Sequence, residues 1–248
     1  MFIFLRFLLA HLIGDFPLQS RSVYRAKVKN IYGKMIHATI VGLTMAALNW
    51  PYFKVPLFWG IILINILGHF LQDWFKLQIT QKIKNPNNFF VFMVDQLLHI
   101  ATLALIFLTP LGKEISPFRQ TSSSFIQLYN NHRLIVFLIC LMTVSFAGTF
   151  ILATFKSTFF PERFSTPYLE PLEKAYGILE RSLMFFTVLF IPWGLALLPF
   201  FLIPKFFFAN FQMKRLKGNA FTPFLIDTFL GMLLVLSSCP ITYRIIPN

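Results

Sequence analysis

The sequence predicts an all-α fold, a polytopic bundle of about seven (six to eight) transmembrane helices. Apolar residues make up 56% of the 248 positions, and phenylalanine alone occupies 33 of them, far from the composition of an ordinary soluble domain. Mostly apolar stretches of about 18 or more residues recur along the whole chain, and such stretches are long enough to cross a bilayer as helices. We therefore expect a multi-pass membrane protein.

Seven apolar runs account for the expected helices. Their approximate bounds are 2–19, 35–50, 57–75, 88–111, 132–154, 176–208 and 220–239. The first run has no basic segment before it and contains Arg6, so we expect a mature helix rather than a signal peptide. The sixth run is too long for one crossing, and the Pro-Trp-Gly sequence at 192–194 predicts a bent or hairpin pair, 176–191 and 195–208.

Three regions follow from this order of runs. Residues 1–112 are expected to form a four-helix transmembrane bundle. Residues 113–175 are expected to supply an outer polar loop, the fifth span and an interfacial connection, and residues 176–248 the C-terminal transmembrane helices with the break near 192–194.

The net charge of +13 is concentrated beside the ends of apolar runs. Two basic clusters, 21–34 and 76–84, follow the first and third runs, which end on the same side of the membrane by simple alternation. Basic loop residues mark the cytoplasmic side, so the N-terminus is predicted to lie outside. Because the basic residues form no separate module, the bilayer is the expected partner and nucleic acid is not.

Histidine and aspartate recur four residues apart inside the apolar runs, in three pairs: His11 with Asp15, His69 with Asp73, and Asp95 with His99. Residues four apart lie on one face of a helix, so each pair presents two side chains to the same neighbour. Ionisable residues inside an apolar span are costly and usually functional. With His37 near the start of the second run, all seven side chains fall toward the predicted cytoplasmic ends of four consecutive helices.

Four consecutive helices with short connections pack as an antiparallel bundle, which would bring the seven side chains to one level. Imidazole and carboxylate suit Zn²⁺, with Mn²⁺ or Fe²⁺ as alternatives. Seven ligands exceed those that one zinc takes, so we expect two ions bridged by a carboxylate. Such a centre activates water and clamps a phosphoryl group, which predicts phosphoester hydrolysis. The catalytic residues expected are Asp15, Asp73, Asp95 and Lys76.

Further polar side chains are assigned to substrate binding. They are Gln19, Arg25, Lys27, Gln96, Glu180, Arg181, Lys205 and Asp227. Lys76, which follows Asp73 by about one turn, is placed to hold an anionic group. A lone acid within an apolar run normally has a partner, and Lys205 or Arg181 would serve Asp227.

At these residues the sequence resembles a bacterial membrane family known as domain of unknown function 3307. The shared features are an Ala-His-Leu-x-Gly-Asp-Phe-x-x-Gln stretch from Ala10, His37, a His-x-x-x-Asp-x-x-Lys run from His69 and an Asp-Gln-x-x-His run from Asp95. Longer members of the family also contain a Gly-x-x-Glu-Arg element, which begins at Gly177 in this sequence. They are also similar in a later lysine and a later acidic residue, here Lys205 and Asp227. The resemblance implies the bacterial inner membrane and supplies no activity.

The helical His/Asp pairs are also similar to the ligand patterns of zinc-dependent phospholipases C and of bacterial membrane-bound metal-dependent hydrolases. That similarity implies multinuclear zinc and phosphodiester hydrolysis. We therefore expect an integral-membrane, metal-dependent hydrolase of a lipid-linked or membrane-associated phosphoester, with its site near the cytoplasmic side.

Alternatives stay open on the sequence alone. The same cluster suits a divalent-cation or proton-coupled transporter or channel, in which polar residues should continue across the bilayer. A second alternative is that each His/Asp pair is a hydrogen-bonded couple that makes helix packing specific. A third is that the protein is a non-catalytic membrane partner of another protein and uses the metal for structure. The outer halves of the first four runs contain almost no polar residues, which favours the enzyme.

Overall fold

The computed structural model describes residues 2–83, 87–113, 124–160, 171–216 and 221–245. Every regular element within these ranges is a helix, and no strand occurs among them, so the all-α prediction is confirmed. Among the described residues, four helical segments are long and apolar enough to cross a membrane: Ile31–Leu48, Pro56–Lys82, Phe89–Leu108 and His132–Phe159. The expected total of seven crossings stays a prediction.

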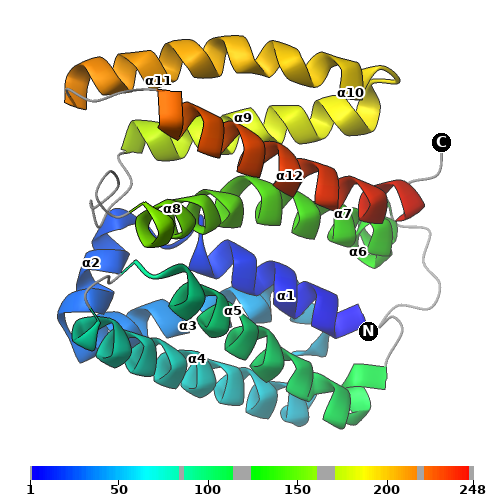
Figure 1. Cartoon of the computed structure of the whole chain (residues 1–248). Coiled ribbons are helices and arrows are strands. Elements are labelled where there is room, and N and C mark those ends of the chain that lie inside the picture. The colour runs from blue at the N-terminus through cyan, green and yellow to red at the C-terminus, as the bar shows by residue number, and fades with distance from the viewer. Residues whose placement is uncertain (1, 84–86, 114–123, 161–170, 217–220, 246–248) are drawn as a thin grey trace. The chain divides into compact units, whose positions relative to one another are not determined.

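The chain divides into two compact units, Met1–Met142 and Thr143–Asn248, with the boundary inside the fifth predicted span. The helices of the first unit are α1 (Phe2–Asp15), α2 (Arg21–Lys29), α3 (Ile31–Leu48), α4 (Pro56–Lys82), α5 (Phe89–Ala104), α6 (Ser124–Asn130) and α7 (His132–Met142) (Figure 1). Three short 3-10 turns join them: η1 (Trp50–Tyr52), η2 (Leu105–Leu108) and η3 (Pro110–Lys113).

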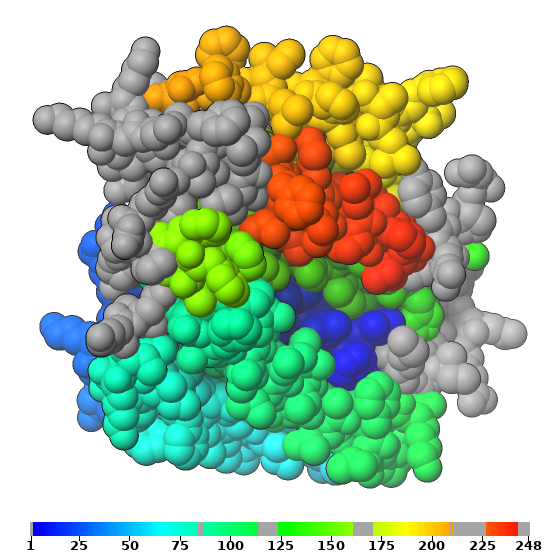
Figure 2. All heavy atoms as spheres, in the orientation of Figure 1, coloured from blue at the N-terminus to red at the C-terminus, as the bar shows by residue number. Residues whose placement is uncertain are grey.

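Helix α1 lies at the centre of the first unit. Its residues are apolar on nearly every side, and most of them are buried, as expected for a helix enclosed by others. A dark-blue patch of it is visible on the face shown in Figure 2. Helices α3, α4 and α5 follow in antiparallel order, each packed against the one before it.

Helix α2 corrects the sequence prediction, which treated 21–34 as a basic loop. The Ser20 side chain accepts a hydrogen bond from the Val23 amide and so caps the start of α2. The Asn30 side chain accepts from the Gly33 amide and caps the start of α3. The stretch was missed because α2 is short and has no long apolar run.

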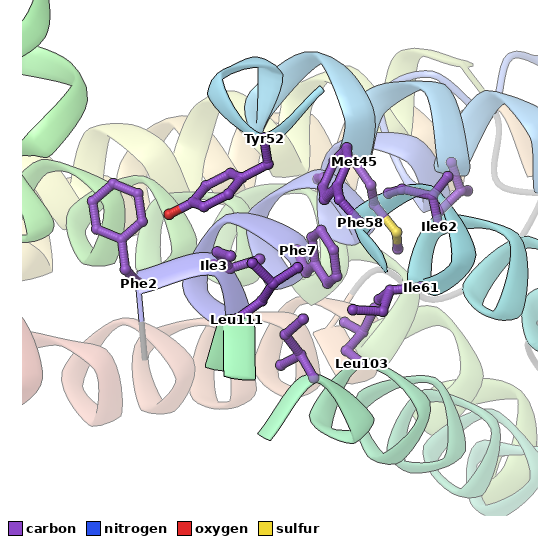
Figure 3. Close-up of a cluster of buried hydrophobic side chains, with 13 residues drawn as sticks. Phe2, Ile3, Phe7, Met45, Tyr52, Phe58, Ile61, Ile62, Leu103 and Leu111 are labelled. Carbon is purple, nitrogen blue, oxygen red and sulfur yellow. The ribbon is translucent and has the colours of Figure 1, made fainter. Parts of the chain in front are cut away.

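The apolar core of the first unit occupies one end of the bundle. Figure 3 shows its side chains, which come mainly from the start of α1, the end of α3, the start of α4 and the end of α5, and from the turns η1, η2 and η3. The buried members labelled there are Phe2, Ile3, Phe7, Met45, Tyr52, Phe58, Ile61, Ile62, Leu103 and Leu111. The opposite halves of the same four helices carry the predicted ligands, so core and polar cluster take separate levels of one bundle.

Glycines let these helices approach closely at the level of the ligands. A Cβ atom on Gly14 of α1 would lie 2.8 Å from the Val41 Cγ2 atom of α3, and one on Gly68 of α4 would lie 2.9 Å from the Thr102 Cγ2 atom of α5. Small residues at helix contacts are typical of membrane bundles, where close packing drives association. Each of these glycines directly precedes a predicted ligand.

The second unit contains a π-helical turn, η4 (Thr143–Ala147), followed by α8 (Gly148–Phe159), α9 (Pro171–Phe190), α10 (Gly194–Leu197), η5 (Leu198–Phe201), α11 (Leu202–Leu216) and α12 (Phe221–Ile245). Within the run 176–208, α9 ends before the Pro-Trp-Gly sequence, and α11 runs back alongside α9 as a hairpin (Figure 1). The rings of Tyr176 and Phe208 stack with their centroids 4.0 Å apart across this hairpin.

Candidate metal centre

The seven predicted ligands meet at the polar end of the first unit. Their exposed fractions are all 8% or less, and they come from four helices: His11 and Asp15 (α1), His37 (α3), His69 and Asp73 (α4), Asp95 and His99 (α5). The i, i+4 spacing holds as expected, since each pair shares one inward face. The expectation that antiparallel packing would bring these side chains to one level is therefore met.

Three of these side chains form a compact triad. The Asp15 Oδ1 atom lies 2.9 Å from His37 Nε2 and 3.5 Å from His69 Nε2, and the two nitrogens are 3.1 Å apart. Zinc with bonds of roughly 2.0 Å in tetrahedral geometry needs ligand atoms roughly 3.3 Å apart. The Asp15–His37–His69 triad could therefore hold a metal ion. The Asp73 Oδ2 atom lies beside the fourth position, 3.6 Å from His37 Nε2 and 3.4 Å from His69 Nε2.

A second triad consists of His69, Asp73 and His99, whose ligand atoms lie within 4.8 Å of one another. The Asp73 Oδ2 atom is 3.4 Å from His69 Nε2, and the His69 and His99 rings stack with centroids 4.2 Å apart. The two triads share His69, which turns the same nitrogen toward both carboxylates. One nitrogen lone pair binds one ion, so the triads are not independent sites.

His11 and Asp95 border the triads. The His11 Nε2 atom is 3.9 Å from Asp15 Oδ2, and Asp95 Oδ1 is 3.5 Å from His99 Nε2. Among the described residues, His11 Nε2, His99 Nε2 and Asp73 Oδ2 are buried atoms that accept or donate no hydrogen bond. Buried polar atoms normally have a partner, so these atoms mark a place for an ion or water.

Two lysines reach into the cluster. The Lys27 Nζ atom lies 2.7 Å from Asp73 Oδ1, and Lys76 Nζ lies 2.7 Å from Asp95 Oδ2. With neutral imidazoles, three aspartates and two lysines leave one negative charge. A buried unpaired charge is costly, so a further cation, either a metal ion or a proton on one imidazole, is required for balance.

Two glutamines orient the carboxylate of Asp15. The Gln96 amide donates to Asp15 Oδ2 and to Asp95 Oδ2, at 3.2 Å each. The Gln19 amide nitrogen lies 3.2 Å from His37 Nε2 and also donates to the Asp15 backbone carbonyl at 3.1 Å. Gln19, Gln96, Lys27 and Lys76 therefore all touch the ligands, whereas Arg25 is exposed on α2 and makes no such contact in the described structure.

The predicted C-terminal residues form a separate buried cluster within the second unit. Lys205 Nζ lies 2.7 Å from Glu180 Oε2. Arg181 donates to the Val144 and Ser145 carbonyls of the π-helical turn and to the Thr149 hydroxyl. Arg181 therefore satisfies carbonyls that the π-helical turn leaves available.

The prediction that Asp227 pairs with Lys205 or Arg181 was wrong. Its carboxylate lies 3.0 Å from Lys156 Nζ, and Lys156 also lies 3.2 Å from Glu173 Oε1. Sequence reasoning missed Lys156, although a lysine alone among apolar residues of α8 is a signal of its own.

Comparison with known proteins gives one match. Residues 3–126, half of the chain, match the model of a family described as "Protein of unknown function (DUF3307)". The matched segment includes all seven ligands, both glutamines and both lysines of the cluster. No curated protein and no solved structure matches the chain.

Proposed function

The chain belongs to this family of unknown function, and we propose that it is a metal-dependent phosphoester hydrolase of the bacterial inner membrane. One observation carries the proposal: a triad of three protein ligands lies beside two inserted lysines. Catalytic zinc sites typically use three protein ligands and an open position. Lysines beside such a position suit an anionic substrate.

We propose that one ion, zinc in preference to manganese or iron, is held by Asp15, His37 and His69. The sequence led us to expect two ions. The sharing of His69 between the triads and the neutralisation of Asp73 by Lys27 both favour one.

When bound, a divalent ion supplies an acidic water and polarises a phosphoryl oxygen. The chain's own residues would do the rest. Lys76 is 26% exposed at its side chain and pairs with Asp95, so it would move to a non-bridging phosphoryl oxygen as substrate enters. The Asp95 carboxylate, freed from the lysine, would accept the proton of the attacking water as the new P–O bond forms and the ester P–O bond breaks. The leaving oxygen would take its proton from solvent.

A membrane-associated substrate is proposed because four helical segments are long and apolar enough to span a bilayer. The ligands lie at the ends of helices that carry the basic clusters, and basic loops favour the cytoplasmic side. A lipid-linked or membrane-associated phosphoester would meet the site there.

A cation or proton transporter is the second candidate, since a proton on one imidazole also balances the charge of the cluster. A transporter needs polar groups on both sides of its site. In the first unit the other half of the bundle is mainly the apolar core around Phe7, Phe58 and Leu103 (Figure 3). Its buried polar side chains include Arg6, Asn49 and Asn65 and no carboxylate or histidine among the described residues, which supports the enzyme over the carrier.

The test is hydrolysis of a generic chromogenic phosphodiester by the purified full chain in detergent. The proposal expects activity that a chelator removes and zinc restores. His69→Ala should lose activity by more than about 100-fold, beyond what changes to outer-shell partners cost. His132→Ala, a histidine of α7 that packs on Phe2, is the matched control and should retain it. Activity that survives both the chelator and His69→Ala would reject the proposal.

A further inference from the structure

Helix α2 turns one of its four basic side chains inward. Arg21, Arg25 and Lys29 are exposed and recur every fourth residue along one face, whereas Lys27 is 6% exposed and points to the ligands. A long cationic side chain normally keeps its head in water. The burial of the Lys27 head therefore calls for an explanation.

The backbone holds Lys27 in this place. The Asn30 amide donates to the Ala26 carbonyl, and the Asn30 side chain caps α3 at Gly33. A Cβ atom on Gly33 would lie 2.0 Å from the Ala26 carbonyl carbon, so only glycine allows α2 to pack this closely on α3. The position of Lys27 is thus set by the turn between two helices and not by its ion pair alone.

Lys27 neutralises the one carboxylate of the second triad. Its Nζ atom lies 2.7 Å from Asp73 Oδ1, and Asp73 is the acidic member beside His69 and His99. An ion in that triad would lie close to a buried ammonium group, and two cations in a desolvated site repel strongly. In the first triad the carboxylate is Asp15, which contacts histidines and glutamines and has no lysine ion pair among the described residues. The Asp73 Oδ2 atom also lies 3.6 Å from His37 Nε2, so an ion in the first triad would face the oxygen of Asp73 that Lys27 leaves unpaired.

We propose that Lys27 limits the centre to one metal ion, because its ammonium group supplies the positive charge beside Asp73 that a second ion would otherwise supply. The inference rests on the proposed function, whose metal triad it takes as given. Without the ammonium, Asp73 and His99 would be available to a second ion, with Asp95 Oδ1 3.5 Å from His99 Nε2 as a further ligand. The side chain would then decide between mononuclear and dinuclear chemistry in an otherwise unchanged ligand set.

The experiment measures zinc stoichiometry and affinity for the purified full chain by elemental analysis and calorimetry. The wild type should bind one ion, and Lys27→Met should bind two, the second at least tenfold tighter than any further binding by the wild type. Lys27→Arg keeps the charge and Lys29→Met changes an exposed neighbour on α2, so both should stay at one. Lys27→Gln, which keeps a donor for Asp73, replaces Lys27→Met if circular dichroism shows that the latter is unfolded.

The outcomes separate this inference from the proposed function. One ion in both the wild type and the folded neutral variant would overturn the role of Lys27 and leave the metal triad standing. Two ions in the wild type would overturn it as well. A wild type that binds no zinc would reject the metal centre itself, and this inference with it.

Discussion

The Nε2 atoms of His37 and His69 lie 3.1 Å apart, with Asp15 Oδ1 within 3.5 Å of both. Two unprotonated imidazole nitrogens at that separation repel, so either a proton lies between them or both face the same cation. The contact joins α3 to α4 inside the bundle, where no water-exposed surface relieves it. This pair is therefore the most informative place to test for a metal.

Removal of either histidine of the pair should abolish metal binding. His37→Ala or His69→Ala leaves two ligands of the triad, and we expect zinc content to fall from about one ion per chain to trace levels, a larger loss than the ~10–100-fold of an outer-shell change. Elemental analysis after dialysis checks this. His132→Ala should keep its zinc, and equal retention in all three variants would contradict the triad.

Gln96 should tune the centre without being a ligand. Gln96→Ala removes the donor that joins Asp15 to Asp95, so we expect zinc affinity to fall by about 10–100-fold with one ion still bound. Competition with a coloured chelator measures the change. Thr44→Ala, which removes a hydroxyl donor to the Ile40 carbonyl within α3, is the control and should leave the affinity unchanged.

Close helix packing beside the site should be sensitive to a single methyl group. Gly14→Ala would place its Cβ 3.0 Å from the Val41 Cα atom, so the backbone must shift, and we expect a loss of about 1–3 kcal/mol in the free energy of unfolding. Gly60 of α4 has open space around it, and Gly60→Ala should be neutral or up to about 1 kcal/mol stabilising. Thermal unfolding in detergent compares the two, and equal effects would contradict the packing.

The ion pair of the second unit should behave as a unit. Glu180→Gln or Lys205→Met leaves an unpaired buried charge, which we expect to cost about 3–5 kcal/mol. The double variant Glu180→Gln/Lys205→Met removes both charges and should cost clearly less than the sum of the single changes. Additive losses in a double-mutant cycle would show that the two side chains do not interact.

Much of the ligand set could be predicted from spacing alone. Asp15, Asp73 and His99 each lie four residues from a partner, and the period of a helix fixes that such pairs share a face. Alternation of consecutive helices then brings the ends of α1, α3, α4 and α5 together. The helical period and the alternation of consecutive helices can both be applied to the sequence without coordinates.

What the sequence could not give depends on contacts between distant segments. Lys27 lies in a short, mostly polar stretch without a long apolar run, so we did not expect α2 as a helix, and spacing alone does not place its one buried lysine on Asp73. The same limit applies to Asp227 and Lys156, which are 71 residues apart in sequence and pair at 3.0 Å. Which of several possible partners an isolated charge takes is decided by packing, not by spacing.

The sharing of His69 between the two triads could not be predicted from the sequence, because a count of seven ligands does not show which side chains face the same point. Shared ligands reduce the capacity of a site, and only coordinates reveal the sharing.

X-ray absorption at the zinc edge of the purified full chain tests the metal triad most directly. We expect about one zinc per chain, with a first shell of imidazole nitrogen and carboxylate oxygen at about 2.0–2.2 Å and the outer scattering of two histidine rings. Protein that holds no zinc after loading, or zinc whose shell lacks imidazole scattering, would contradict the triad and the function proposed from it.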